Sequence, residues 1–322
     1  MSQSVFRAVV FAYSEVGVRC LRALIEHRVE VCLVFTHENS AAENAWFGSV
    51  AKLAADHTIE VVTPADPNCE VWVARVRALA PDYIFSFYYR SLLGEALLAC
   101  ARWGALNMHG SLLPKYRGRA CVNWAILNGE IQTGATLHYM IAKPDAGPII
   151  AQESVPIGID DTALTVSQAD AEAAARLIVR WLPALAAGPP AGRSMNLSKG
   201  SYFGGRTPED GRIDWSWPAA RIHALIRAVA PPFPGAFTDV GSQRLVFASS
   251  HWGGEKSAVP QLAPRLYVED ARMYLDCSDG LRLQIPAVTL DAVRLDPQAF
   301  RRLYGEMALT FSSIPSKRKL QL

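Results

Sequence analysis

Ala8-Val-Val-Phe-Ala-Tyr13 is the first of five apolar segments that decide the fold of this 322-residue chain. The other four strand-like segments are residues 31–35, 59–62, 83–88 and 105–108. The segments between them have helical character and cover residues 16–27, 42–57, 70–80 and 94–101. Nearly continuous apolar strands that alternate with helices predict a parallel sheet covered on both faces. Right-handed crossovers then predict a Rossmann-like α/β domain.

The second half of the chain begins with a predicted hairpin. Strand-like runs at 135–141 and 149–155 flank Lys143-Pro-Asp-Ala-Gly147, which has the composition of a tight turn. A long helix is expected from Ala163 to about Leu182, and the Gly- and Pro-rich stretch 187–192 cannot continue it.

Beyond this stretch, a helix near 218–229 precedes a set of closely spaced short strands, which predicts a small, OB-like β-barrel. These strands are expected near residues 236–240, 245–248, 265–268, 273–276 and 281–285. The predicted domains are a catalytic domain at 1–188, a linker at 189–202, a C-terminal OB-like domain at 203–312 and a basic tail at 313–322.

Composition places the chain among ordinary globular proteins, with 50% hydrophobic and 19% charged residues. A formal net charge of +2 implies no general affinity for nucleic acid or anionic membranes. The six cysteines form no C-x-x-C pair, so we expect free thiols and no zinc site. No leader-like start and no run of about 20 apolar residues is present, which predicts a cytoplasmic enzyme without membrane insertion. No pattern indicates the oligomeric state.

Two polar residues at the end of the fifth strand are the first candidates for chemistry. Asn107 and His109 are two residues apart, so their side chains are expected on one face of the sheet. Open α/β sheets bind ligands at this edge. A histidine transfers protons near neutral pH, and an amide donates to a developing oxyanion. A structural histidine and an amide that only satisfies backbone groups fit the local sequence about as well.

The remaining candidates are charged residues in loops. Asp145 lies in a turn where Asp is common for conformational reasons, and this interpretation is favoured over a carboxylate that orients His109. Lys115, Arg117 and Arg119 form either a solvated loop or a site for an anionic substrate. No G-x-G-x-x-G, P-loop, G-x-S-x-G or H-E-x-x-H motif is present. This favours group-transfer chemistry without a nicotinamide dinucleotide or a metal.

These motifs together resemble the formyltransferases that use 10-formyltetrahydrofolate, such as methionyl-tRNA formyltransferase, glycinamide ribonucleotide transformylase and the sugar N-formyltransferases. The resemblance rests on Asn107-Met-His109, Ser111-Leu-Leu-Pro114, Arg117-Gly-Arg119 and Asp145-Ala-Gly147. Other motifs, including Phe35-Thr-His37, Phe85-Ser-Phe-Tyr-Tyr-Arg90 and Arg206-Thr-Pro208, are most similar to the formyltransferase part of the bifunctional polymyxin-resistance protein. That family formylates UDP-4-amino-4-deoxy-L-arabinose for lipid A modification. We expect this activity without the dehydrogenase that follows it there.

The resemblance implies a catalytic trio of Asn107, His109 and Asp145, a nucleotide-sugar substrate and no nucleic-acid partner. It implies that the 10-formyltetrahydrofolate site contains Ser91, Leu92, Leu93, Arg119, Ile141, Ala142, Lys143 and Pro144. It also implies direct transfer, because no Ser or Cys is expected beside a base. Two departures from the family are Cys121, where proline is common, and the sequence of the loop 141–144.

Several alternatives stay open. Methionyl-tRNA formyltransferase would need a cationic surface, but residues 38–51, where a basic insert is expected, contain no Lys or Arg. Another nucleotide sugar is a further acceptor, and a formyltetrahydrofolate hydrolase would release formate without an acceptor. A binding module without turnover is disfavoured by the complete trio. Arg206 is expected to contact a diphosphate or to form a structural ion pair.

Overall fold

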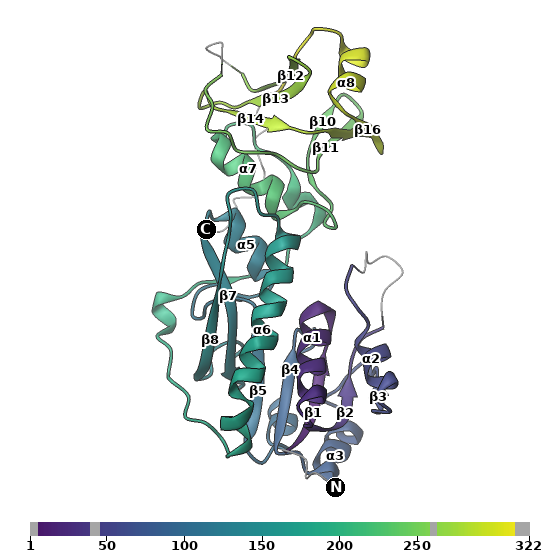
Figure 1. Cartoon of the computed structure of the whole chain (residues 1–322), viewed down its shortest axis with the longest axis vertical. Coiled ribbons are helices and arrows are strands. Elements are labelled where there is room, and N and C mark those ends of the chain that lie inside the picture. Colours follow the sequence, from purple (N-terminus) through teal and green to yellow (C-terminus); the bar gives the residue numbers. More distant parts are fainter. Residues whose placement is uncertain (1–5, 39–45, 258–262, 313–322) are drawn as a thin grey trace. The chain divides into compact units, whose positions relative to one another are not determined.

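The computed structural model describes residues 6–38, 46–257 and 263–312, which form parts of two compact units (Figure 1). The first unit comprises Met1–Cys121, Gln132–Pro156 and Val166–Gly205. The second comprises Val122–Ile131, Ile157–Thr165 and Arg206–Leu322. Two short segments within the predicted catalytic domain, Val122–Ile131 and Ile157–Thr165, therefore belong to the second unit. The predicted domain boundaries after residues 188, 202 and 312 stay a prediction.

A seven-stranded sheet with the order β3-β2-β1-β4-β5-β7-β8 forms the centre of the first unit. Its strands are β1 (Arg7–Ala12), β2 (Glu30–Phe35), β3 (Val61–Val62), β4 (Tyr83–Phe87), β5 (Gly104–His109), β7 (Gln132–Tyr139) and β8 (Ile149–Pro156). The first five pair in parallel, whereas β7 is antiparallel to both β5 and β8. The predicted Rossmann-like fold class is confirmed, with the hairpin added at one edge.

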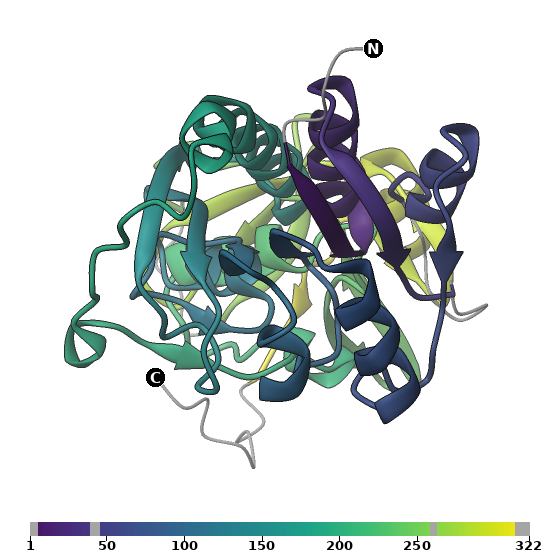
Figure 2. The same cartoon turned by 90° about the horizontal axis from the view of Figure 1, so that it is seen from below.

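Helices cover both faces of this sheet, as Figure 2 shows. The helices are α1 (Ser14–Glu26), α2 (Val50–Asp56), α3 (Glu70–Leu79), α4 (Glu95–Leu98) and α6 (Ala163–Ala186). Side chains of α1, α2 and α6 share one apolar cluster with Leu106 and Met108 of β5. Side chains of α3 and α4 share the other with Ala105. Because strand side chains alternate, Asn107 and His109 belong to the face of Ala105.

The helix expected at 42–57 is shorter than predicted. It begins after Ser49, whose hydroxyl accepts a hydrogen bond from the backbone N–H of Lys52 at 3.1 Å. A serine in this position satisfies one of the free amides of the first turn, so it defines where the helix begins. Residues 46–48 precede the helix without regular structure, and 39–45 lie outside the described residues.

The second unit contains two four-stranded antiparallel sheets with the orders β10-β11-β15-β16 and β14-β13-β12-β17. The strands are β10 (Ala236–Val240), β11 (Gln243–Phe247), β12 (Arg265–Glu269), β13 (Arg272–Asp276), β14 (Arg282–Ile285), β15 (Val288–Leu290), β16 (Val293–Leu295) and β17 (Leu309–Thr310). The helices are α5 (Cys121–Leu127), whose first residue still belongs to the first unit, α7 (Ala219–Ala228) and α8 (Pro297–Tyr304). The five predicted strands are present. None of the described helices combines the length and apolar character that a bilayer span requires.

The sequence did not predict β15, β16 and α8, and the turn between the two strands explains why. Asp291 and Ala292 connect them, with positive φ angles of 44° and 69°. Two-residue hairpin turns of this kind are recognised in a sequence by Asn-Gly or Asp-Gly, and Asp-Ala is not such a signal. The predicted basic tail at 313–322 lies outside the described residues.

Candidate active site

The register between β5 and β7 gathers four polar side chains on one face of the sheet. Asn107 pairs with His138, and His109 pairs with Thr136. Residues that pair directly across two strands point to the same face. His109 and His138 are only 6% and 1% exposed, so two histidines are buried here beside an amide.

Asp145 reaches both histidines from the turn that follows β7. Its Oδ1 lies 3.4 Å from His109 Nδ1 and 3.9 Å from His138 Nε2. Its Oδ2 accepts a hydrogen bond of 2.9 Å from the backbone N–H of Gly118. Asp145 has a φ of 50°, a conformation that Asp tolerates better than most residues. The turn preference and the contact with His109, which were alternatives in the sequence, are therefore both observed.

The surroundings of His109 favour its charged form. Its Nε2 donates to the carbonyl oxygen of Tyr116 at 2.9 Å and lies 3.4 Å from Cys121 Sγ. Because Nδ1 faces Asp145, both ring nitrogens face hydrogen-bond acceptors. Only the imidazolium, which carries a proton on each nitrogen, can donate to both of them. Burial alone lowers the pKa of His109, but Cys121, Asp145 and the Tyr116 carbonyl outweigh burial and raise it to about 10. The expectation that no Cys lies beside a base is wrong, because Cys121 begins α5 next to His109.

His138 is a member of this cluster that the sequence did not reveal. Its Nδ1 donates to the carbonyl oxygen of Tyr139 at 2.8 Å, which leaves Nε2 to accept from Asn107 Nδ2 at 3.1 Å. Burial and then the charge on His109 lower the pKa of His138 to about 4. His138 is therefore neutral near pH 7 and fixes the orientation of the Asn107 amide. The available signal was a histidine in Leu137-His-Tyr-Met-Ile141, a run that is otherwise aliphatic or aromatic.

A pair of two-residue strands supports the loop that follows β5 and that holds Asp145 in place. β6 (Arg117–Gly118) pairs in parallel with β9 (Tyr202–Phe203), and the rings of Tyr116 and Phe203 stack at 5.3 Å. Gly118 has a φ of 97°, and a Cβ there would lie 2.1 Å from the carbonyl oxygen of Phe203. Only glycine fits this position, and its N–H is the donor that holds Asp145.

The residues predicted to contact the folate lie on three loops of the first unit. Leu93 follows β4, and Met140 precedes the loop 141–144; both pack against the apolar cluster that contains Ala105. Exposure is as follows: Leu92, Arg119, Ile141, Ala142 and Lys143 are exposed, and Ser91, Leu93 and Pro144 are half-buried. The structure thus brings two of the loops to the face that carries Asn107 and His109. Their contacts with a folate stay a prediction.

Three cations that the sequence left without a role have distinct surroundings. Lys115 is exposed, and the guanidinium of Arg117 lies 5.9 Å from the ring centre of Tyr202. In the second unit, Arg206 lies 4.7 Å from the ring centre of Trp124, and burial lowers its pKa. These geometries assign no ligand to any of the three.

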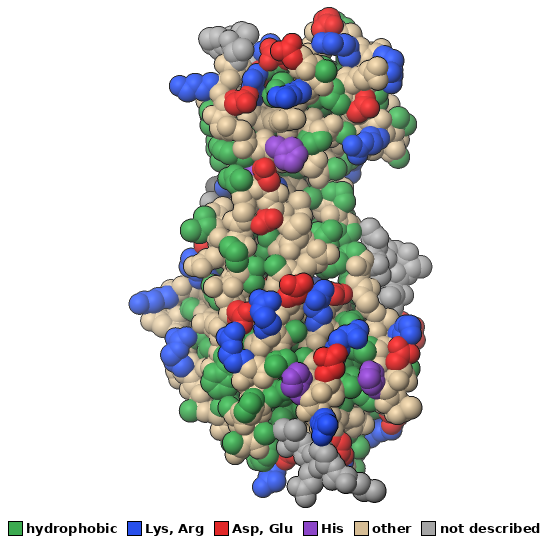
Figure 3. Space-filling model, in the orientation of Figure 1, with side chains coloured by type: hydrophobic (Ala, Val, Ile, Leu, Met, Phe, Trp, Pro, Cys, Tyr) green, Lys and Arg blue, Asp and Glu red, His purple; other side chains and the backbone are tan. Residues whose placement is uncertain are grey.

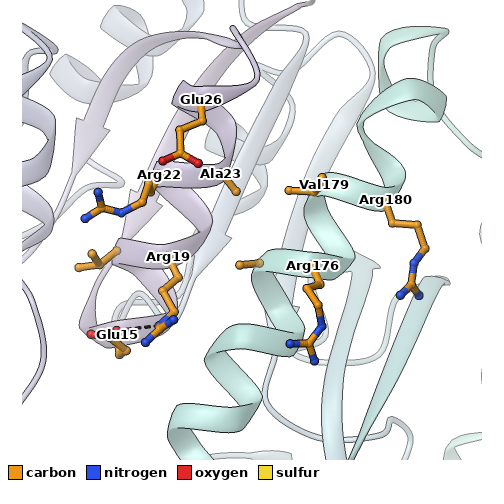
Figure 4. Close-up of a pocket in the computed structure, with 10 residues that line it drawn as sticks. Glu15, Arg19, Arg22, Ala23, Glu26, Arg176, Val179 and Arg180 are labelled. Carbon is orange, nitrogen blue, oxygen red and sulfur yellow. Dashed lines mark hydrogen bonds and ion pairs between the residues drawn. The ribbon is translucent and has the colours of Figure 1, made fainter.

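A groove between α1 and α6 is a separate feature of the first unit (Figure 4). It contains none of the predicted site residues, and its charged side chains largely pair with one another. Arg19 lies 2.7 Å from Glu15, and Arg176 and Arg180 lie 2.8 and 2.9 Å from Glu153. Figure 3 shows that cationic and acidic side chains are interspersed on this face. Because these charges are already paired within the first unit, the groove is not assigned as the site.

The cluster around His109 combines groups suited to acyl transfer. An imidazolium and an amide N–H can donate to one oxygen, and a carboxylate beside them can accept a proton. Across residues 6–38, 46–257 and 263–312, no three His, Cys, Asp or Glu side chains are grouped to hold a metal ion.

Comparison with known proteins agrees with this chemistry. The formyl transferase family model matches residues 7–182, and the model of the formyl transferase C-terminal domain matches residues 206–300.

Solved structures share the fold. The N-formyltransferase from Helicobacter canadensis, in complex with folinic acid and dTDP-3-aminofucose, is 20% identical, with a TM-score of 0.68 over 87% of this chain and 98% of that protein. WlaRD, a sugar 3N-formyl transferase solved in the presence of dTDP and 5-N-formyl-THF, is 19% identical, with a TM-score of 0.67 over 88% and 98%. HypX from Aquifex aeolicus, in complex with tetrahydrofolic acid, is 18% identical, with a TM-score of 0.62 over 94% of this chain and 47% of HypX.

Proposed function

Because this chain belongs to the formyl transferase family, we propose that it transfers the formyl group of 10-formyltetrahydrofolate to the 4-amine of UDP-4-amino-4-deoxy-L-arabinose. The grouping of Asn107, His109 and Asp145 at one strand end carries the proposal. The chain shares its fold with sugar formyltransferases that were solved with dTDP or a dTDP-sugar. This likeness supports a nucleotide-sugar acceptor. The arabinose sugar, and with it a place in lipid A modification and polymyxin resistance, rests on the sequence motifs.

In the proposed mechanism the bound folate supplies an electrophilic formyl carbon, and the neutral sugar amine attacks it. The second amide hydrogen of Asn107 and the Nδ1 proton of the His109 imidazolium donate to the oxygen on which negative charge develops, while the Nε2 proton stays with the Tyr116 carbonyl. Asp145 holds His109 and accepts the proton that leaves the attacking nitrogen. As the oxyanion collapses, the bond from the formyl carbon to N10 of the folate breaks, N10 takes up that proton, and neutral tetrahydrofolate leaves. The Asn107 amide keeps its orientation because its other hydrogen is donated to His138. Direct transfer of this kind requires no covalent intermediate.

Charge supports a nucleotide sugar over a transfer RNA. Polyanion binding depends on several cationic contacts with phosphates, and it weakens steeply with added salt. The chain has a net charge of only +2, and residues 38–51 contain no Lys or Arg. Methionyl-tRNA formyltransferase is therefore the second candidate, and it enters the test below as a competing substrate.

The acceptor is tested by incubating the purified protein with 10-formyltetrahydrofolate and UDP-4-amino-4-deoxy-L-arabinose. We expect the mass of the formylated UDP-sugar and an equal amount of tetrahydrofolate. A dTDP-linked 3-amino sugar and Met-tRNA serve as parallel acceptors. More efficient formylation of either one would overturn the proposed acceptor, and formate release without any acceptor would indicate a hydrolase.

Gly118→Ala tests whether the loop that holds Asp145 is needed for turnover. The added Cβ would lie 2.1 Å from the Phe203 carbonyl oxygen, so the loop and the N–H that binds Asp145 must move. A displacement of about 1 Å at such a site costs up to about 10² in rate, and we expect kcat to fall by about 10–10². Gly188→Ala is the matched control, because Gly188 also has a positive φ, of 128°, but has no atom within 4 Å of an added Cβ. Equal activities of the two variants would contradict the prediction.

A further inference from the structure

A buried carboxylate lies in the apolar core beneath the proposed site. Asp170 belongs to α6 and is 1% exposed. Its Oδ2 accepts a hydrogen bond of 3.1 Å from the hydroxyl of Tyr88, whereas its Oδ1 is buried without a hydrogen-bond partner. Taking a carboxylate out of water is costly unless its charge is compensated. The proposed mechanism does not use this group, so its burial requires another explanation.

The backbone places Asp170 and Tyr88 directly behind the catalytic histidine. Tyr88 follows β4 with a φ of 59°. A Cβ on Gly110, the residue after His109, would lie 1.7 Å from the Tyr88 hydroxyl oxygen and 3.1 Å from Asp170 Oδ2. The hydroxyl and the carboxylate therefore contact the chain where β5 ends. Any side chain at residue 110 would push the Tyr88 hydroxyl and the Asp170 carboxylate away from the end of β5.

The titratable groups around Asp170 come from each neighbouring element. They are Tyr88 after β4, His109 at the end of β5 and Cys20 of α1. Of these, only His109 carries a positive charge near neutral pH. Burial raises the pKa of Asp170 to about 7, opposed by the hydrogen bond from Tyr88 and the charge on His109. Since this coupling is mutual, an ionised Asp170 also favours the charged imidazole.

His109 has its own charged and titratable neighbours. Cys121 and Asp145 favour its charged form, and His138 is neutral. Asp170 instead reaches the chain at Gly110, the residue after His109, so any effect on His109 passes through the end of β5 and needs no contact with the substrate.

We propose that Asp170, held by Tyr88, is a positioning residue that maintains the charged form of His109 from inside the core. The role in catalysis rests on the proposed formyl transfer, in which a protonated His109 stabilises the oxyanion. A purely structural role for the pair makes a different prediction. The hydrogen bond with Tyr88 would then matter and the negative charge would not.

Asp170→Asn separates these roles, because the amide oxygen still accepts from Tyr88 while the charge is removed. We expect the pH at which His109 loses its proton to fall by about 0.5–1, as for a charge removed near a buried group. This is measured by NMR titration of ¹⁵N-labelled histidines, and His109→Gln identifies the resonance. The alkaline limb of the kcat/KM profile should shift by the same amount. Near pH 10, kcat/KM of the variant should be about threefold lower than that of wild type, whereas near pH 7.5 the two should differ by less than about twofold. Tyr88→Phe removes the donor but keeps the negative charge of Asp170, which stays ionised at the alkaline pH where His109 titrates, so its shift of the His109 titration should be smaller than that of Asp170→Asn.

Glu172→Gln is the matched control, two residues further along α6. Glu172 is about half exposed and faces Arg19 and Arg176 at the surface, so its charge should not affect His109. Thermal stability gives a second readout. The folded pKa of Asp170, about 7, is above the unfolded value of about 3.9, so stability is lost as the pH rises towards and through the folded pKa. Asp170→Asn should therefore melt above wild type near pH 8, and the difference should shrink near pH 5.

The outcomes separate this inference from the proposed function. An unchanged His109 titration in Asp170→Asn would overturn the inference even if formyl transfer is observed. A shifted titration with no transfer to any acceptor would instead refute the proposed function, because the NMR measurement needs no substrate. A shift of equal size in Glu172→Gln would show a general charge effect and would also overturn the inference.

Discussion

Replacing His109 by glutamine is expected to lower kcat by about 10²–10⁴ with the fold intact. The glutamine amide can still donate to the Tyr116 carbonyl, so the buried position stays filled and satisfied. It cannot carry the positive charge that Asp145 and Cys121 stabilise on the imidazole. The loss is measured as steady-state turnover of the folate in the presence of the sugar amine, with melting temperature as the test of folding.

His57→Gln is the control for this substitution. His57 is an exposed residue just after α2, so the same change there should leave kcat unaltered. If His109→Gln retained more than about a tenth of wild-type turnover, the imidazolium would not be the main oxyanion donor.

Cys121 requires its own comparison, because its sulfur lies 3.4 Å from His109 Nε2. A thiol beside a base is also the arrangement of a covalent acyl-enzyme. Direct transfer predicts that Cys121→Ala keeps turnover within about tenfold of wild type, with an alkaline limb moved to lower pH because one group that favours the imidazolium is lost. Complete loss of activity, or a formylated Cys121 found by mass spectrometry, would replace the direct mechanism with a covalent one.

The sequence predicted those site residues whose positions depend on neighbouring residues in the chain, through strand alternation and turn composition. The alternation of β5 placed Asn107 and His109 on one face, and Pro144-Asp-Ala-Gly marked the turn that carries Asp145. His138 and the Tyr88–Asp170 pair were not predicted. They meet their partners across sequence separations of 31 and 82 residues, which only strand register and helix packing determine.

The same division holds for the fold. Long apolar runs such as Tyr83–Phe87 predicted the parallel strands, because burial on both faces leaves a continuous hydrophobic signal. Three-residue strands such as Val288–Leu290 carry no such signal. They form because neighbouring strands pair with them.

Asp145→Asn is the second substitution with a large expected effect, about 10²–10⁴ in kcat. The amide oxygen can take the place of Oδ2 and accept from the Gly118 N–H, which preserves the turn. The amide nitrogen would then face His109 Nδ1, 3.4 Å away in the wild-type geometry, where it can only donate. His109 would have to present a bare Nδ1, so the neutral tautomer with the proton on Nε2 becomes favoured. Both the oxyanion donor and the proton acceptor of the proposed mechanism are lost in one step.

Asp66→Asn is the matched control, because Asp66 also accepts a backbone N–H, from Asn68 at 2.9 Å, in an exposed turn of the first unit. The substitution there should change neither kcat nor KM. The way in which Asp145→Asn loses activity then distinguishes two roles. A fall in kcat with a constant KM for the folate indicates that Asp145 acts in the transition state through His109. A raised KM with unchanged kcat would mean that Asp145 mainly holds the loop 141–144 against the folate, which would contradict its proposed role in proton transfer.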